Sequence, residues 1–260
     1  MAYRFGRNEQ CIKRVRAVTP VILNAARATV QHGVELCPEA VPVAGVLMGW
    51  WQFSNRTAAA LVRLYDAGFT IEAAPLMRNL IGHSYAMNWL ADNGQPAIRA
   101  LQAHAENHRR KLTDNINATW HLPEPHPDVC ATPLEFTDDE DERLHRRLLG
   151  ELQNFDTLVK AYGSADVYPI YRYHSAYSHT TLSTADAYLH EDEGLLHYMT
   201  TPKGEISAER IWIPVALLQA AAAADSILVG RPMKSVIDKA MSDLGLPESI
   251  LKPRRTRPPS

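Results

Sequence analysis

Apolar residues recur at steps of three and four along most of the chain, the spacing of one face of an α-helix. Glycines support this pattern: Gly33, Gly68 and Gly163 stand where helices should stop, and Gly94 with Pro96 separates two others. The sequence predicts an all-α fold, a single-domain bundle of about eight helices with one short β-hairpin. The helices are expected at residues 8–32, 41–67, 71–92, 95–118, 138–162, 166–190, 207–229 and 231–243.

Two local signals refine this picture. The segment LHYMTTPKGEIS carries a strand pattern, and its Pro202-Lys203-Gly204 is expected to close the hairpin. Thr137 precedes a run of acidic residues, which is typical of a helix N-cap followed by a first turn that favours negative charge. We therefore expect the helix at residues 138–162 to begin just after Thr137.

The chain is expected to form one domain over residues 1–251. Residues 121–136 are rich in proline and predict a long surface loop. The segments on both sides of this loop are too apolar to be stable alone, which argues against two domains. Residues 252–260, with the sequence KPRRTRPPS, are basic and proline-rich and predict a disordered tail.

Composition narrows the class of protein without pointing to an activity. The hydrophobic fraction is 46%, the charged fraction is 22%, and the net charge of −2 gives a pI near 6.6. Such a balance creates no global attraction to nucleic acids or acidic membranes. No run has the length of a transmembrane helix, and the first residues lack a signal-peptide core. Three widely spaced cysteines favour the reducing cytoplasm over a disulfide framework.

The helix expected at residues 71–92 is apolar almost all round, which predicts a buried central helix. Arg78, Asn79, His83 and Asn88 are the exceptions. A buried guanidinium is costly without a partner, so Arg78 should face a carboxylate, backbone carbonyls or a bound anion. Two interpretations stay open: a structural ion pair or a site residue. In either case this helix should lie beside the helix expected at residues 166–190.

Within the helix expected at residues 166–190, six polar groups fall on one stripe. This stripe is either an unusually composed solvated face or a site. If it is a site, His179 should be accessible while Leu182 and Leu189 pack inward. Ser175 would then orient the imidazole, and Arg172 would hold an anionic group. The six residues are Arg172, Ser175, His179, Ser183, Asp186 and His190.

The helix RTAAALVRLYDAGFTIEAAPLMRNLI, followed later by Tyr171-Arg172 and by Ser175 and His179 at a spacing of four, resembles a bacterial family of helical proteins called domain of unknown function 5677. The resemblance runs from about Trp51 to Tyr188. It implies an all-helical fold, and the family name carries no activity. The family's usual glutamate, four residues after the arginine of the central helix, is replaced here by Gly82.

A looser similarity is to the HEPN superfamily of helical ribonucleases and nucleotide-binding proteins, in which an arginine precedes a histidine by a few residues. Arg78 with His83 and Arg172 with His179 fit this signature. The resemblance implies a metal-independent RNA-processing or defence nuclease. Histidine would relay a proton from a ribose 2′-hydroxyl, and arginine would stabilise the phosphorane charge.

The arginine–histidine spacing is weak evidence when taken alone. Chance produces about two or three such pairs in a chain of this composition, and four are present. The Arg78 and Arg172 pairs stand out by context: the first lies on the predicted buried helix and the second overlaps the family pattern. The others are Arg27 with His32 and Arg99 with His104.

A metal site is the competing interpretation. His104 and His108 are four residues apart and can point the same way from one helix. With His179 or His83 from a neighbouring helix, they would bind zinc, iron or manganese in a small-molecule enzyme. His108 shares a stripe with apolar residues and is expected to face the interior.

Three function classes therefore stay open: an HEPN-like ribonuclease, a metal-dependent small-molecule enzyme, and a non-catalytic binding or scaffolding protein. The partners expected are RNA or an anionic small molecule, with no membrane. A homodimer is also expected, because the alanine-rich helix in residues 208–229 would let a second copy approach closely.

Overall fold

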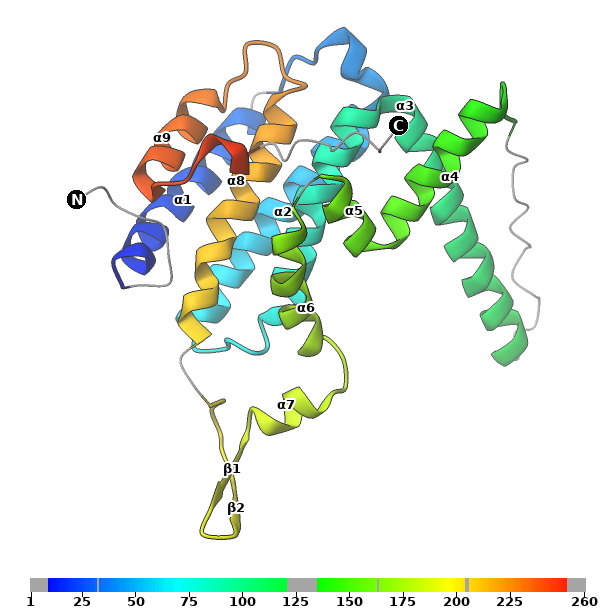
Figure 1. Cartoon of the computed structure of the whole chain (residues 1–260). Coiled ribbons are helices and arrows are strands. Elements are labelled where there is room, and N and C mark those ends of the chain that lie inside the picture. The colour runs from blue at the N-terminus through cyan, green and yellow to red at the C-terminus, as the bar shows by residue number, and fades with distance from the viewer. Residues whose placement is uncertain (1–8, 32, 121–134, 163, 204–205, 252–260) are drawn as a thin grey trace.

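The computed structural model describes residues 9–31, 33–120, 135–162, 164–203 and 206–251. Over these ranges the protein is an all-α bundle with one two-stranded antiparallel hairpin, as the sequence predicted (Figure 1). Most of the expected proline-rich loop, residues 121–134, and the expected basic tail, residues 252–260, lie outside the described residues. Among the helices of the described ranges, none is both long and apolar enough to cross a membrane.

The elements follow the predicted order, with breaks that the sequence did not reveal. The α-helices are α1 (Glu9–Gln31), α2 (Val41–Asp66), α3 (Ala74–Thr119), α4 (Asp139–Gln153), α5 (Phe155–Ala161), α6 (Tyr168–Ala176), α7 (Leu182–Asp186), α8 (Trp212–Asp225) and α9 (Lys234–Leu244). Short 3-10 helices are η1 (Pro38–Ala40), η2 (Ala165–Val167), η3 (Ile206–Ile211) and η4 (Glu248–Ile250). The strands are β1 (Leu189–Asp192) and β2 (Leu195–Tyr198).

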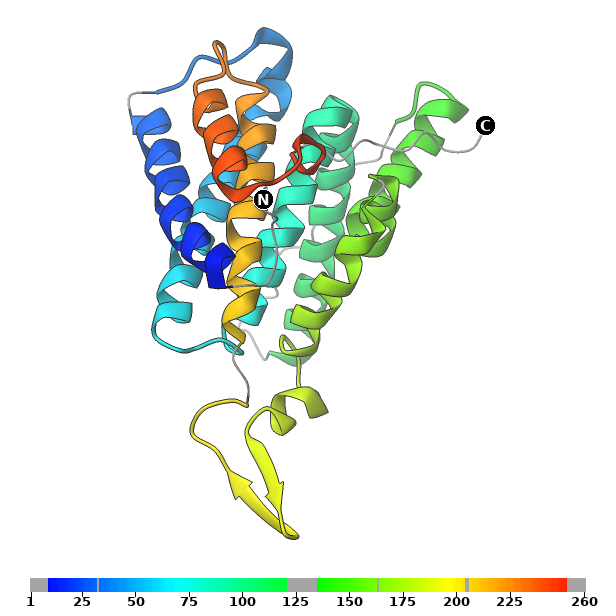
Figure 2. The same ribbon diagram turned by 60° about the vertical axis from the view of Figure 1, so that its left-hand side comes forward.

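Helix α8 lies at the centre of the bundle and packs against α1, α2, α3 and α9 (Figures 1 and 2). Nearly every residue from Ile213 to Asp225 is buried. Its run of alanines lets the surrounding helices approach closely, as small side chains generally do. Because these contacts are made within the chain, α8 does not offer the exposed face that a homodimer built on it would need.

Helix α3 has a buried first half and a more exposed second half, separated by a kink. Gly94 has φ 58° and ψ −136°, a conformation that glycine adopts without strain. The predicted separation of two helices at this residue is therefore confirmed. The first half packs on α2, α6 and α8, so the expected neighbour relationship between the central helix and the helix that follows residue 166 is also confirmed.

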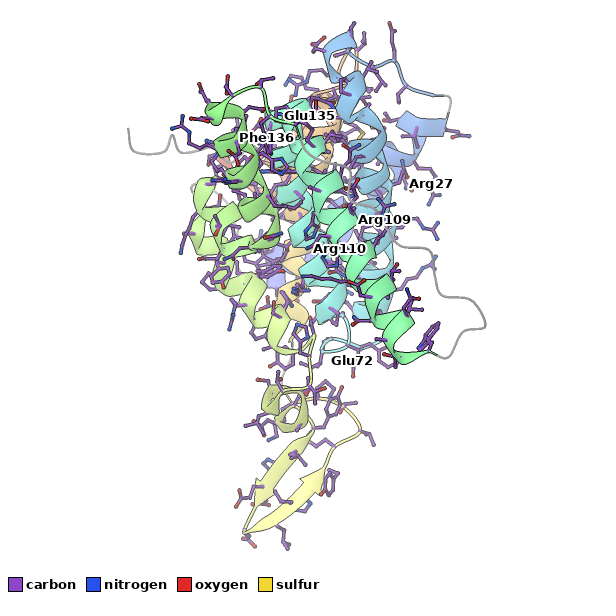
Figure 3. All side chains as sticks on the ribbon, turned by 90° about the vertical axis from the view of Figure 1, so that its right-hand side faces the viewer. Arg27, Glu72, Arg109, Arg110, Glu135 and Phe136 are labelled. Carbon is purple, nitrogen blue, oxygen red and sulfur yellow. The ribbon has the colours of Figure 1, made fainter. Side chains whose placement is uncertain are left out.

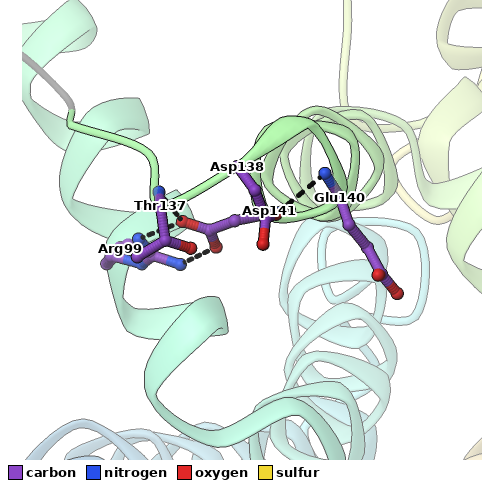
Figure 4. A network of polar contacts seen from close by, with 5 residues as sticks. All are labelled: Arg99, Thr137, Asp138, Glu140 and Asp141. Atoms are coloured by element: carbon purple, nitrogen blue, oxygen red, sulfur yellow. Dashed lines mark hydrogen bonds and ion pairs between the residues drawn. The ribbon is translucent and has the colours of Figure 1, made fainter.

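The second half of α3 is joined to α4 by an ion pair. The two terminal nitrogens of Arg99, Nη1 and Nη2, each contact one carboxylate oxygen of Asp141 (Figure 4). The N-cap of α4 is Asp138, not Thr137: its carboxylate accepts from the backbone N–H groups of Glu140 and Asp141 at 2.9 and 2.8 Å. Thr137 instead donates its own backbone N–H to Asp141 at 3.3 Å.

The helix expected at residues 138–162 is divided in two at Asn154. The backbone of Asn154 is extended, and its side-chain oxygen accepts a hydrogen bond from the backbone N–H of Asp156 at 3.1 Å. This cap marks the start of α5. This break turns Phe155 toward α6, where its ring stacks on that of Tyr171.

The helix expected at residues 166–190 ends early, at Ala176. Hydroxyls of the following Ser and Thr residues bond to its last carbonyls: Ser178 to His174 at 2.8 Å and Thr181 to Ala176 at 2.6 Å. Such side-chain bonds compete with continued helix. The continuous six-residue stripe is therefore wrong, since His179 lies in the turn after α6 and His190 lies in β1.

The hairpin exists but turns earlier than predicted. Its turn is Glu193-Gly194, with φ 49° and 79°, and not Pro202-Lys203-Gly204. Two positive φ values suit the right-handed twist of a two-residue hairpin. Together with α7, the hairpin projects from one end of the bundle (Figure 2). Tyr188 donates its hydroxyl to Glu72, which lies at that end (Figure 3).

Candidate functional site

The candidate site is centred on Arg78, where α3 meets α6. Its Nε donates to Ser175 Oγ at 3.0 Å, and its guanidinium lies 4.9 Å from the centre of the Tyr171 ring. The Tyr171 ring is in turn stacked on Phe155, with centroids 3.9 Å apart. Arg78 is half-buried, and its contacts are a neutral hydroxyl and an aromatic face. Within the described residues, no carboxylate lies within ion-pair distance of it.

A pocket of about 460 Å³ opens beside Arg78, and we call it the Arg78 pocket. It brings together four residues to which the sequence analysis gave a candidate role in a site: Arg78, Arg172, Ser175 and His179. Arg78 comes from α3, Arg172 and Ser175 come from α6, and His179 comes from the turn that follows. Its other lining residues are Gln153, Asn154, Phe155, Asp156, Tyr168, Tyr171, Ala176, Thr181 and Ser183.

The Arg78 pocket is electropositive. Arg172 and His179 are exposed, and the described part of the chain provides no ion-pair partner for either. The lining carboxylate is Asp156, and it is paired with Lys160 at 2.6 Å. Two guanidinium groups and an imidazole therefore face a space in which the available negative charge is already engaged. An anion would find strong hydrogen-bond donors there.

His83 lies next to this pocket, in a second hollow of about 360 Å³. Its Nδ1 lies 2.8 Å from the backbone oxygen of Asn79, and its ring contacts Phe53 and Trp50 with centroids 4.5 and 6.0 Å away. Burial lowers the pKa of His83, and the hydrogen bond to Asn79 opposes this only in part. The imidazole is therefore predominantly neutral at pH 7.

Two expectations about the geometry around His179 are wrong. Ser175 does not orient its imidazole, because the Ser175 hydroxyl donates to the Tyr171 carbonyl at 2.8 Å and accepts from Arg78. Leu182 does not pack inward: its exposed fraction is 83%, because the helix that would have buried it has already ended. Leu189 is half-buried.

The histidine pair of the metal hypothesis is close in space but incomplete. The rings of His104 and His108 are 4.5 Å apart between centroids, and His108 is exposed rather than interior. Burial, helped by the nearby His108 and Lys111, lowers the pKa of His104. The described ranges contain no group of three or more His, Cys, Asp or Glu side chains placed to hold a metal, so neither His83 nor His179 joins this pair.

Sequence reasoning missed the aromatic residues of the site. The sequence predicts Phe155 inside a longer helix, and Tyr171 enters only as part of the family pattern with Arg172. The available signal was Asn154 followed two residues later by Asp156, which marks a helix start. That break determines where Phe155 lies and therefore how the Tyr171 ring is held.

A buried polar cluster that the sequence does not predict lies away from the pocket face of α6. His174 Nε2 is 3.7 Å from Glu209 Oε2, and both side chains are almost fully buried. The neighbouring Arg210 pairs with Asp66 at 2.5 Å and lies over the Tyr65 ring. These contacts hold η3 against α2 and α6, so we assign the cluster to the stability of the fold.

Residues 44–195, more than half of the chain, match the family of unknown function DUF5677. The chain belongs to DUF5677. All residues that line the Arg78 pocket and the second hollow fall inside the matched region. No match is found among curated proteins or among solved structures. DUF5677 membership therefore agrees with the resemblance drawn from the sequence, and it leaves the activity to be argued from the site.

Proposed function

We propose that this DUF5677 protein is a metal-independent ribonuclease whose active site is the Arg78 pocket. One observation carries the proposal: Arg78, Arg172 and His179, distant in the sequence, line the same space. Both members of the Arg172–His179 pair and the arginine of the Arg78–His83 pair thus line one pocket. Of the remaining pairs, Arg99 is engaged by Asp141 and supports the fold instead.

The chemistry assigned to this pocket is transesterification. His179 accepts the proton of a ribose 2′-hydroxyl as the 2′-oxygen attacks the adjacent phosphorus. The bond from phosphorus to the 5′-oxygen breaks, and that oxygen takes the proton back from the imidazolium. The products are a 2′,3′-cyclic phosphate and a 5′-hydroxyl, so the atoms and protons balance without an external reagent.

The two arginines have different roles in this scheme. Arg78 is fixed by Ser175 and by the Tyr171 ring, so its remaining N–H groups are preorganised toward the pocket. Arg172 is exposed on α6 and is free to follow the phosphate. Together they offset the extra negative charge of the pentavalent phosphorus, which is greatest in the transition state.

The second candidate is a non-catalytic protein that binds a small phosphorylated ligand. Its support is specific: among the described residues, no side chain holds the His179 ring in one orientation, and the pocket volume is in the range of small-molecule sites. Both candidates require the same arginines, and they differ in whether His179 performs proton transfer.

Incubation of single-stranded RNA with the protein in EDTA separates the candidates. The ribonuclease proposal predicts cleavage with 2′,3′-cyclic phosphate ends, and no cleavage of the same sequence made with 2′-deoxyribose. Binding of the RNA with no cleavage would support the second candidate. Cleavage of the deoxy substrate would contradict the proposed chemistry, because that substrate has no 2′-hydroxyl.

A further inference from the structure

We infer that the hollow beside the Arg78 pocket is a nucleobase subsite, so the ligand of this site is a nucleotide unit and not a bare phosphate. This inference rests on the proposed function for the phosphate half of the site. It makes its own claim about the hollow, whose lining includes Trp50, Arg78, Gly82, His83, Phe155 and Tyr171.

The two spaces are adjacent. Arg78, Gln153, Phe155 and Tyr171 line both the Arg78 pocket and the hollow. They form a shared wall, and Arg172 and His179 lie on the pocket side of it. One ligand can therefore place an anionic group in the pocket and a second, different group in the hollow.

The hollow is built for a flat ring. Three of its walls are aromatic: Trp50 and His83, whose rings are 6.0 Å apart at 87°, and the Phe155–Tyr171 stack. Rings fixed by one another lose little entropy when a further ring packs against them, and base stacking on aromatic side chains is worth about 1–3 kcal/mol per base.

The polar groups of the hollow suit an uncharged ligand with hydrogen bonds at its edge. Arg78 is the charged residue among its lining, while Asn79 and Gln153 supply exposed amides that both donate and accept. The backbone carbonyl of Asn79 can only accept a hydrogen bond, so Nδ1 of His83 carries the proton. Nε2 of the neutral ring is left as an acceptor. An aromatic ring with mixed donors and acceptors, as in a nucleobase, matches this set.

Gly82 provides a way to close the hollow without dismantling it. A Cβ at this position would lie 3.9 Å from Tyr171 Cε2, an ordinary contact, so a side chain can begin here without a clash at its first atom. Gly82 is inside α3, where a leucine also favours helix. Gly82→Leu should therefore fill the space that a base would occupy and leave the Arg78 pocket open.

Calorimetric titration with adenosine 5′-monophosphate, ribose 5-phosphate and adenosine tests the inference. The wild-type protein should bind adenosine 5′-monophosphate at least ten-fold more tightly than ribose 5-phosphate. Both Gly82→Leu and Trp50→Leu should abolish this difference and leave the affinity for ribose 5-phosphate unchanged. Trp120→Leu, the same substitution at an exposed residue that lines neither space, should have no effect.

The results also separate this inference from the proposed function. Equal affinity for adenosine 5′-monophosphate and ribose 5-phosphate would overturn the base subsite, as would an equal loss of both affinities in Gly82→Leu. Absence of RNA cleavage would contradict the ribonuclease alone. The subsite stands in that case if adenosine itself binds and Gly82→Leu prevents it, because adenosine has no phosphate and does not depend on Arg172.

Discussion

Arg78 of α3 and Ser175 of α6 are joined by a hydrogen bond of 3.0 Å from Nε to Oγ, although 97 residues separate them in the sequence. The Ser175 hydroxyl in turn donates a hydrogen bond to the backbone carbonyl of Tyr171, one turn earlier in α6. Arg78 is thereby held against α6 without a carboxylate partner among the described residues. Its charge is left for whatever enters the pocket.

Arg78→Ala should lower the free energy of unfolding by about 1–2 kcal/mol, the cost of one part-buried hydrogen bond and the lost packing on Tyr171. Chemical denaturation measures this loss. Arg172→Ala is the matched control, because Arg172 is exposed in the same pocket and its loss should change stability by less than about 0.5 kcal/mol. A loss of about 4 kcal/mol or more for Arg78→Ala would indicate that a buried partner charge is left unpaired, and it would contradict the neutral contacts of Arg78 with Ser175 and Tyr171.

Stability should fall in mild acid because three histidines resist protonation in the folded state. Burial lowers the pKa of His83, His104 and His145 below their ordinary value of 6.5. Below pH 6.5 the unfolded chain takes up protons that the folded chain does not, so unfolding becomes more favourable as the pH drops. Denaturation between pH 7.5 and 5 measures the slope.

His83→Gln provides the control for that pH dependence. Because the variant lacks one of the three groups, its stability should fall less steeply with decreasing pH than that of the wild-type protein. An identical slope in both proteins would show that His83 titrates with its ordinary pKa.

The Arg99–Asp141 pair should matter for the attachment of α4 to α3. The hydrogen bonds from Arg99 hold the pKa of Asp141 below its ordinary value of 3.8, so the charged pair is intact at neutral pH and is lost only as the pH falls through that lowered value. Asp141→Asn should lower the melting temperature at pH 7, whereas Asp139→Asn, on the exposed side of the same turn, should not. Equal melting temperatures for the two variants would contradict this role of Asp141.

The fold was largely predictable because its main signal is local. The bounds of α1 and α2 follow from apolar periodicity and glycine stops. The kink in α3 is signalled in the sequence by Gly94 followed two residues later by Pro96. The breaks at Asn154 and Ala176 were not predicted, since each depends on a side chain that takes over a backbone hydrogen bond at the end of a helix. The hairpin was predicted in kind but displaced, because Glu193 adopts a positive φ that is uncommon for its residue type.

The candidate site was predictable in its charged residues and not in its geometry. Arg78 stands out in the sequence as the charged one of four polar exceptions on an apolar helix, and Arg172 and His179 stand out by their pattern. Their proximity depends on the packing of α3 against α6, which no local signal specifies. The stacking of Phe155 on Tyr171 required the break at Asn154 and could not be inferred without it.

We propose that His179 performs chemistry and does not support the fold. The most direct test measures RNA cleavage in EDTA and thermal unfolding on the same preparation of His179→Ala, with His190→Ala as the control at another exposed histidine, in β1. We expect that His179→Ala abolishes cleavage and leaves the melting temperature nearly unchanged, and that His190→Ala changes neither. A His179→Ala protein that still cleaves RNA, or one that is strongly destabilised, would contradict this proposal.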